Sequence, residues 1–173
     1  MNAAHLHLIT NHIPIVGMPV ALFVVVIGHL LRDARVRNVG FFLAVLFALS
    51  SIAVYLSGEG AEEIVEKVAA VSEKVIESHE EAAESAFVVV LVTGGLALLA
   101  LIASATRARL AGVLAALATA GLVASTALLV WTANLGGKIR HPEIQNSSGV
   151  TTPGGDEGGL LPSPEEEEYG EED

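Results

Sequence analysis

Four stretches of apolar residues, each long enough to cross a bilayer, set the pattern of this chain. They cover 13–31, 39–57, 85–105 and 110–133, and no Asp, Glu, Lys or Arg interrupts any of them. A helix needs about 20 mostly apolar residues to span the hydrocarbon core of a bilayer. The pattern therefore predicts an all-α integral membrane four-helix bundle within residues 1–142, in contact with lipid.

The polar segment between the second and third stretches predicts helical structure outside the membrane. Residues 60–84 are rich in charge and contain no proline, and Ser72 precedes Glu73. A serine hydroxyl can cap free backbone N–H groups, and an acid suits the positive end of a helix dipole. We expect an extramembrane extension of the third helix beginning near Glu73, and a separate short helix over 60–68.

Negative charge is concentrated at the end of the chain. The formal net charge is −11, and residues 143–173 hold ten of the 20 acids and none of the nine Lys and Arg. This composition predicts a disordered acidic tail, because it offers too little apolar surface to bury. We expect the tail to contact a basic protein or cations, and the lack of a basic face argues against binding to nucleic acid.

Arginines gather at one side of the predicted bundle. The turn after the first stretch carries Arg32, Arg35 and Arg37, and the turn after the third carries Arg107 and Arg109. The opposite side holds the other four bases, two of them in the longer loop. Short arginine-rich turns are typically cytoplasmic. This predicts a multi-pass membrane protein with both termini outside.

The histidines gather at the side opposite the arginine turns. Five of the six are expected there: His5, His7, His12, His79 and His141. On a helix that starts near Glu73, His79 projects about 120° away from a stripe of glutamates. The stripe is typical of a solvated helix face, whereas His79 shares a side with small residues and is expected to point into the bundle.

Three of these histidines, on separate helices, are candidate cofactor ligands at one level. They are His12, His79 and His141, with Glu59, Glu62 and Glu63 as candidate carboxylate ligands of a metal. The chain has no cysteine, so a metal would need imidazole or oxygen ligands. Such a set suits zinc, copper or iron, and two of the histidines could instead be axial ligands of haem b. The spacing fits no fixed metal motif, and a histidine hydrogen-bonded between helices is an equal alternative for His79.

Four segments resemble an uncharacterised family of small bacterial four-helix inner-membrane proteins. They run from His5 to Gly17, from Tyr55 to Glu63, from His79 to Ala83 and from Trp131 to Ile144. The first is also similar, more distantly, to a domain of unknown function whose first helix opens with a His-x-Pro-Ile-like signature. The resemblance implies the four-helix fold for most of residues 1–144 and supplies no catalytic residue.

Two functions of different classes follow from these patterns. The first is a membrane protein with a His/carboxylate cluster at its outer face, which binds a transition metal or haem for electron transfer or metal handling. The second is a non-catalytic accessory or scaffold subunit, whose small-residue faces pack on a membrane-complex partner or on a second copy of the chain. The sequence leaves open whether the protein is an enzyme.

Overall fold

The computed structural model describes residues 3–68 and 73–140, and within these ranges all regular structure is α-helical. The five helices are α1 (Ala3–Thr10), α2 (His12–Leu30), α3 (Ala34–Val68), α4 (Glu73–Ala105) and α5 (Ala111–Arg140). α2 to α5 each contribute a stretch long and apolar enough to cross a membrane: Ala4–Leu30 (with α1), Ala34–Gly58, Lys74–Ala105 and Ala111–Ile139. The predicted all-α fold with four long apolar helices is confirmed. The predicted tail, 143–173, lies outside the described residues.

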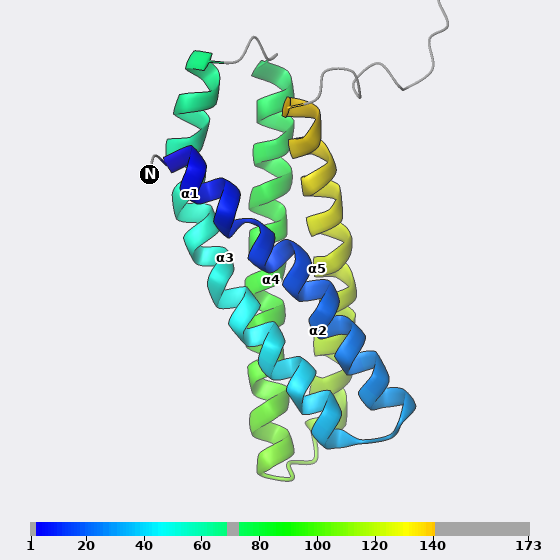
Figure 1. Cartoon of the computed structure of the whole chain (residues 1–173). Helices are drawn as coiled ribbons and strands as arrows, with labels where there is room; N and C mark the ends of the chain where they lie inside the picture. Colours follow the sequence, from blue (N-terminus) through cyan, green and yellow to red (C-terminus); the bar gives the residue numbers. More distant parts are fainter. Residues whose placement is uncertain (1–2, 69–72, 141–173) are drawn as a thin grey trace, which may run out of the picture.

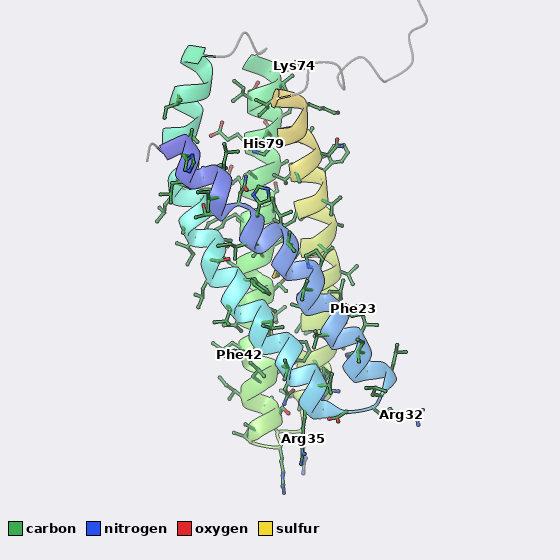
Figure 2. All side chains as sticks on the ribbon, in the orientation of Figure 1. Phe23, Arg32, Arg35, Phe42, Lys74 and His79 are labelled. Carbon is green, nitrogen blue, oxygen red and sulfur yellow. The ribbon has the colours of Figure 1, made fainter. Side chains whose placement is uncertain are left out.

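The helices form two hairpins that pack against each other. α2 pairs with α3 and α4 with α5, while α3 packs on α4 and α2 on α5, and α1 lies along α3. Figure 1 shows α2 and α3 running obliquely across α4 and α5. We name the two ends of this bundle by their residues, as labelled in Figure 2. The histidine end holds α1, Lys74 and His79, and the arginine end holds the turns around Arg32 and Arg107.

Small side chains fill the centre of the bundle and large ones cover its surface. Eight of the 14 residues in the buried core cluster are alanines: Ala21, Ala44, Ala48, Ala86, Ala97, Ala100, Ala115 and Ala118. Phe23 and Phe42, by contrast, are 66% and 54% exposed (Figure 2). Small residues let helix backbones approach closely, which is how helices associate in lipid.

Glycines bring α2 and α3 into backbone contact near the arginine end. A Cβ on Gly40 would lie 2.8 Å from the backbone nitrogen of Val25 and 2.9 Å from the carbonyl oxygen of Ala21. A Cβ on Gly28 would collide with the backbone of Arg37. Because neither clash can be relieved by rotating a side chain, these glycines fix the spacing of the first hairpin.

The prediction that residues 60–68 form a helix separate from the second apolar stretch is wrong. α3 runs without interruption from Ala34 to Val68, through Gly58 and Gly60. A glycine inside a helix costs about 1 kcal/mol relative to alanine. Packing against α1 offsets this cost, since His7 of α1 is bonded to the last apolar turn of α3, and Ala61 is buried beyond it.

The helix of the third apolar stretch, α4, begins where the sequence predicts, but the helix of the fourth stretch, α5, ends later than predicted. α4 starts at Glu73, and three glutamates of the predicted stripe, Glu77, Glu80 and Glu84, are exposed, as expected for a solvated face. α5 continues through Gly136 and Gly137 to Arg140, beyond the end of the predicted stretch 110–133. Gly136 stays helical because it faces the ring of His79 and makes room for it.

Candidate functional site

His79 points from α4 into the bundle, as the helical projection predicts. Its ring is half-buried, and Nδ1 lies 3.1 Å from the carbonyl oxygen of Thr132 on α5. A carbonyl oxygen can only accept a hydrogen bond, so Nδ1 carries the proton in the neutral ring and Nε2 keeps its lone pair. The ring lies over Gly136, where an added Cβ would be 3.0 Å from Cε1.

His7 repeats this arrangement on the other hairpin. It is half-buried, and its Nδ1 lies 3.1 Å from the carbonyl oxygen of Val54 and 3.2 Å from Oγ of Ser57, both on α3. Gly58 faces the ring at an ordinary contact distance, with an added Cβ 3.8 Å from Cε1. The carbonyl again places the proton on Nδ1 and leaves the Nε2 lone pair free.

Both rings lie at the histidine end and interact electrostatically, and we call them the histidine pair. The pair draws on four helices, because α1 and α4 supply the rings and α3 and α5 supply the carbonyls that orient them.

The sequence analysis placed His7 at this end of the bundle but did not include it among the candidate ligands. Its contacts depend on the packing of α1 along α3. One signal could have found it. Ser57 and Gly58, at the end of the second apolar stretch, combine a polar partner with the space that a ring on a neighbouring helix needs.

The predicted cofactor ligands are not brought together in the described part of the chain. His12 is exposed, and its Nδ1 lies 2.7 Å from the carbonyl oxygen of Leu8, one turn earlier. His141 lies outside the described residues. Glu59, Glu62 and Glu63 belong to α3, but their side chains are also outside what is described. Among the described residues, no three His, Asp or Glu side chains gather closely enough to hold a metal ion.

Five buried side-chain polar atoms have no hydrogen-bond partner among the described residues, and two of them belong to residues whose backbone is bonded to His7 or His79. The other three are on Arg37, Asn38 and Thr126. Oγ1 of Thr132, a residue that is 8% exposed, and Oδ1 of Asn11 have no partner among the described residues. Thr132 is the residue that binds His79, and the backbone of Asn11 donates to the carbonyl of His7. Unsatisfied buried groups are rare in native proteins and often mark a place where a water, ion or ligand binds.

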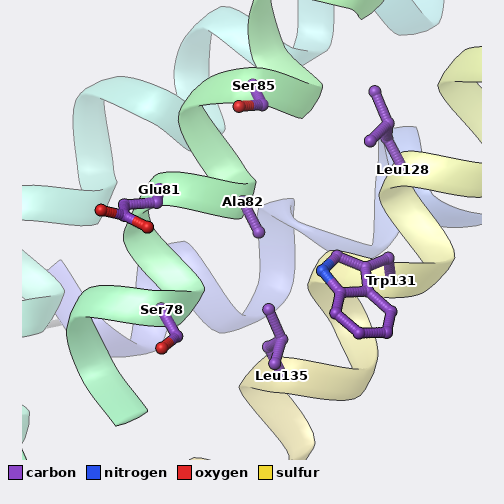
Figure 3. A pocket seen from close by; sticks show the side chains of 7 residues that line it. All are labelled: Ser78, Glu81, Ala82, Ser85, Leu128, Trp131 and Leu135. Carbon is purple, nitrogen blue, oxygen red and sulfur yellow. The ribbon is translucent and has the colours of Figure 1, made fainter. Parts of the chain in front are cut away.

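A groove on the outside of the second hairpin lies apart from the histidine pair. Its volume is about 440 Å³, and Figure 3 shows its lining side chains: Ser78, Glu81, Ala82 and Ser85 from α4, and Leu128, Trp131 and Leu135 from α5. His79 is not among them. The groove is mostly apolar, and Trp131, at 58% exposure, lies on its α5 side.

The fold and the histidine pair define an all-helical bundle of four long apolar helices with two oriented imidazoles at one end. Comparisons with models of known families, with curated proteins and with solved structures found no match. The resemblance to small bacterial inner-membrane proteins therefore stays a prediction.

Proposed function

We propose that this chain is a bacterial inner-membrane protein that crosses the bilayer four times, with the histidine end outside. Four apolar helical stretches of sufficient length support this placement. So does the distribution of side chains, with large apolar residues exposed and alanines inside. The orientation is supported by the five arginines at the opposite end, since short cytoplasmic turns are enriched in them.

At the histidine end, the proposed function is the binding of a transition-metal ion for metal handling or electron transfer at the outer face. The observation that carries it is the hydrogen-bonding pattern that His7 and His79 share, since each donates Nδ1–H to a backbone carbonyl. Histidines that bind metals are held in this way, because the second-shell bond fixes the tautomer and directs Nε2 at the metal.

Neutral imidazoles suit zinc, copper and iron, and the remaining coordination positions need oxygen or nitrogen ligands. His141 and the carboxylates of Glu59, Glu62 and Glu63 stay candidates for these positions. Haem iron would use the same imidazole chemistry, and a Soret band would distinguish it from a bare ion.

Asparagine variants separate ligand binding from structural support. The amide nitrogen of asparagine replaces Nδ1, so His7→Asn and His79→Asn keep a donor for the carbonyl but remove the atom that would bind the metal. We expect the purified wild-type protein to retain about one metal ion per chain in elemental analysis and both variants to lose it at nearly unchanged melting temperature. His29→Asn, at the arginine end, is the control. Equal metal content in all four proteins would refute the metal site.

The second candidate function is that of an accessory or scaffold subunit. One observation favours it, namely that each imidazole fastens two helices, α1 to α3 and α4 to α5. In that case the histidine pair is structural. His79→Ala would then lower stability, while neither the wild type nor any variant would bind metal or show a Soret band.

A further inference from the structure

The two turns at the arginine end are built alike, and each places an arginine in a backbone conformation that favours glycine. Arg32 has φ 52° and Arg107 has φ 53°, and they are the two non-glycine residues with positive φ in the described part of the chain. L-residues with a side chain rarely adopt this left-handed conformation.

The hydrogen bonds identify both turns as Schellman motifs. The amide of Asp33 donates to the carbonyl of Gly28 at 2.9 Å, and the amide of Ala108 donates to the carbonyl of Ala103, also at 2.9 Å. Arg32 and Arg107 occupy the position just after the C-cap, and their own amides complete the motif. Glycine is the usual residue at this position because it has no Cβ to oppose the left-handed conformation.

These turns concentrate positive charge. Five arginines lie in or beside them, with Asp33 as the one acid, for a net charge of +4 (five minus one). Asp33 is already engaged, since its Oδ1 accepts a 2.7 Å hydrogen bond from the amide of Arg35 at the start of α3. Arg32, Arg35, Arg107 and Arg109 are exposed. We call these four the arginine rim; Figure 2 shows Arg32 and Arg35 at the end opposite His79.

We propose that the arginine rim binds the phosphate groups of anionic phospholipids, and that Arg32 and Arg107 occupy glycine-favouring positions because their guanidinium groups are needed there. Guanidinium pairs with phosphate through parallel charged hydrogen bonds. A solvent-facing turn of this type would be more stable with glycine at the left-handed position. Both hairpins have an arginine there instead. The proposal rests on the membrane placement above and is independent of the metal site.

The test uses the full chain in a neutral detergent and follows its melting temperature as phosphatidylglycerol is added. We expect this anionic lipid to stabilise the wild type, phosphatidylcholine to do so more weakly, and inorganic phosphate not at all. The double variant Arg32→Gly/Arg107→Gly should melt at a higher temperature without lipid, since glycine relieves both turns. Its affinity for phosphatidylglycerol should fall about 25-fold, or about fivefold for each arginine lost.

Two matched variants keep the result interpretable. Arg32→Lys/Arg107→Lys retains the charge and should keep most of the lipid affinity. Arg35→Ala removes an arginine from ordinary helical backbone, so it should weaken lipid binding without the gain in melting temperature. Unchanged affinity in the double glycine variant, or equal protection by inorganic phosphate, would overturn the proposal. If the chain still resists alkaline extraction from membranes in that case, lipid binding by the arginine rim is refuted and the proposed membrane placement is not.

Discussion

The two ends of the bundle use glycine for different purposes. At the arginine end, Gly28 and Gly40 face backbone atoms of the partner helix, so α2 and α3 touch directly. At the histidine end, Gly58 and Gly136 face the rings of His7 and His79. The first pair brings two helices together, whereas the second provides space for a polar side chain between them.

This difference shows that the histidine end lacks the close backbone packing of the arginine end. Two helices that associate within lipid are stabilised most by small residues, because these allow direct backbone contact. At the histidine end, two half-buried imidazoles occupy the equivalent positions. Each ring is bonded through Nδ1 to a backbone carbonyl, so Nε2 is the ring atom that a ligand would satisfy.

The largest expected effect is at the arginine end. A methyl group at Gly28 would collide with the backbone of Arg37, which cannot move without separating the two helices. We expect Gly28→Ala to lower the free energy of unfolding in mixed micelles by about 3 kcal/mol, the upper part of the usual range for overpacking. Gly112→Ala, whose added Cβ meets nothing within 4 Å, is the control and should be neutral or slightly stabilising. Equal effects of the two substitutions would contradict this description of the hairpin.

A smaller loss of stability is expected when an imidazole is removed from the histidine end. His79→Ala breaks the bond to Thr132 and leaves space over Gly136, for a cost of about 2 kcal/mol. His29 at the arginine end is exposed and lies 3.2 Å from Oγ1 of Thr119, so His29→Ala should cost no more than about 0.5 kcal/mol. Denaturant unfolding measures the free energy of unfolding of both variants. Equal losses in His79→Ala and His29→Ala would contradict the predicted difference between the two ends.

The two glycines at the histidine end are expected to differ from each other. An added Cβ at Gly136 would lie 3.0 Å from His79, so the ring must move by a few tenths of an ångström, whereas the corresponding distance for Gly58 and His7 is 3.8 Å. Because metal affinity depends on how ligands are oriented, Gly136→Ala should weaken metal binding about tenfold. Gly58→Ala should leave the affinity unchanged. Metal titration measures both, and equal affinities would mean that the position of the His79 ring does not matter.

The smallest effect concerns the second bond of His7. Ser57→Ala removes the contact with Nδ1 of His7 and the bond that the hydroxyl donates to the carbonyl of Val54 in its own helix. That carbonyl still accepts from Nδ1, so a loss of about 0.5 kcal/mol is expected. Ser50 is a matched control, since its hydroxyl donates to the carbonyl of Phe47 in its own helix. If Ser57→Ala and Ser50→Ala shift the melting temperature equally, Ser57 does not support the imidazole.

The sequence predicts the long apolar helices, the start of α4 and the inward direction of His79, because each depends on local pattern. Apolar length and helical projection need no knowledge of neighbouring helices. The continuation of α3 through Gly58 and of α5 through Gly136 could not be read in this way. In both cases an imidazole from another helix packs at the glycine, and that contact outweighs the local tendency of glycine to end a helix.

The candidate site was predicted only in part for the same reason. His79 was identified, but its partner His7 depends on how α1 packs on α3, which the local pattern does not encode. His12 was placed in the site because it lies at the same level as the other candidate histidines, and the structure leaves its ring exposed. His141 and the side chains of Glu59, Glu62 and Glu63 stay untested predictions, since they lie outside what the structure describes.

The most direct test of the histidine pair is X-ray absorption spectroscopy of the zinc-loaded full chain. If His7 and His79 bind the metal, the spectrum will show at least two imidazole nitrogens at about 2.0 Å from zinc, and one fewer in each of His7→Asn and His79→Asn. His29→Asn should leave the spectrum unchanged. An imidazole count that is the same in all three variants as in the wild type, or zinc bound only through oxygen, would contradict the account.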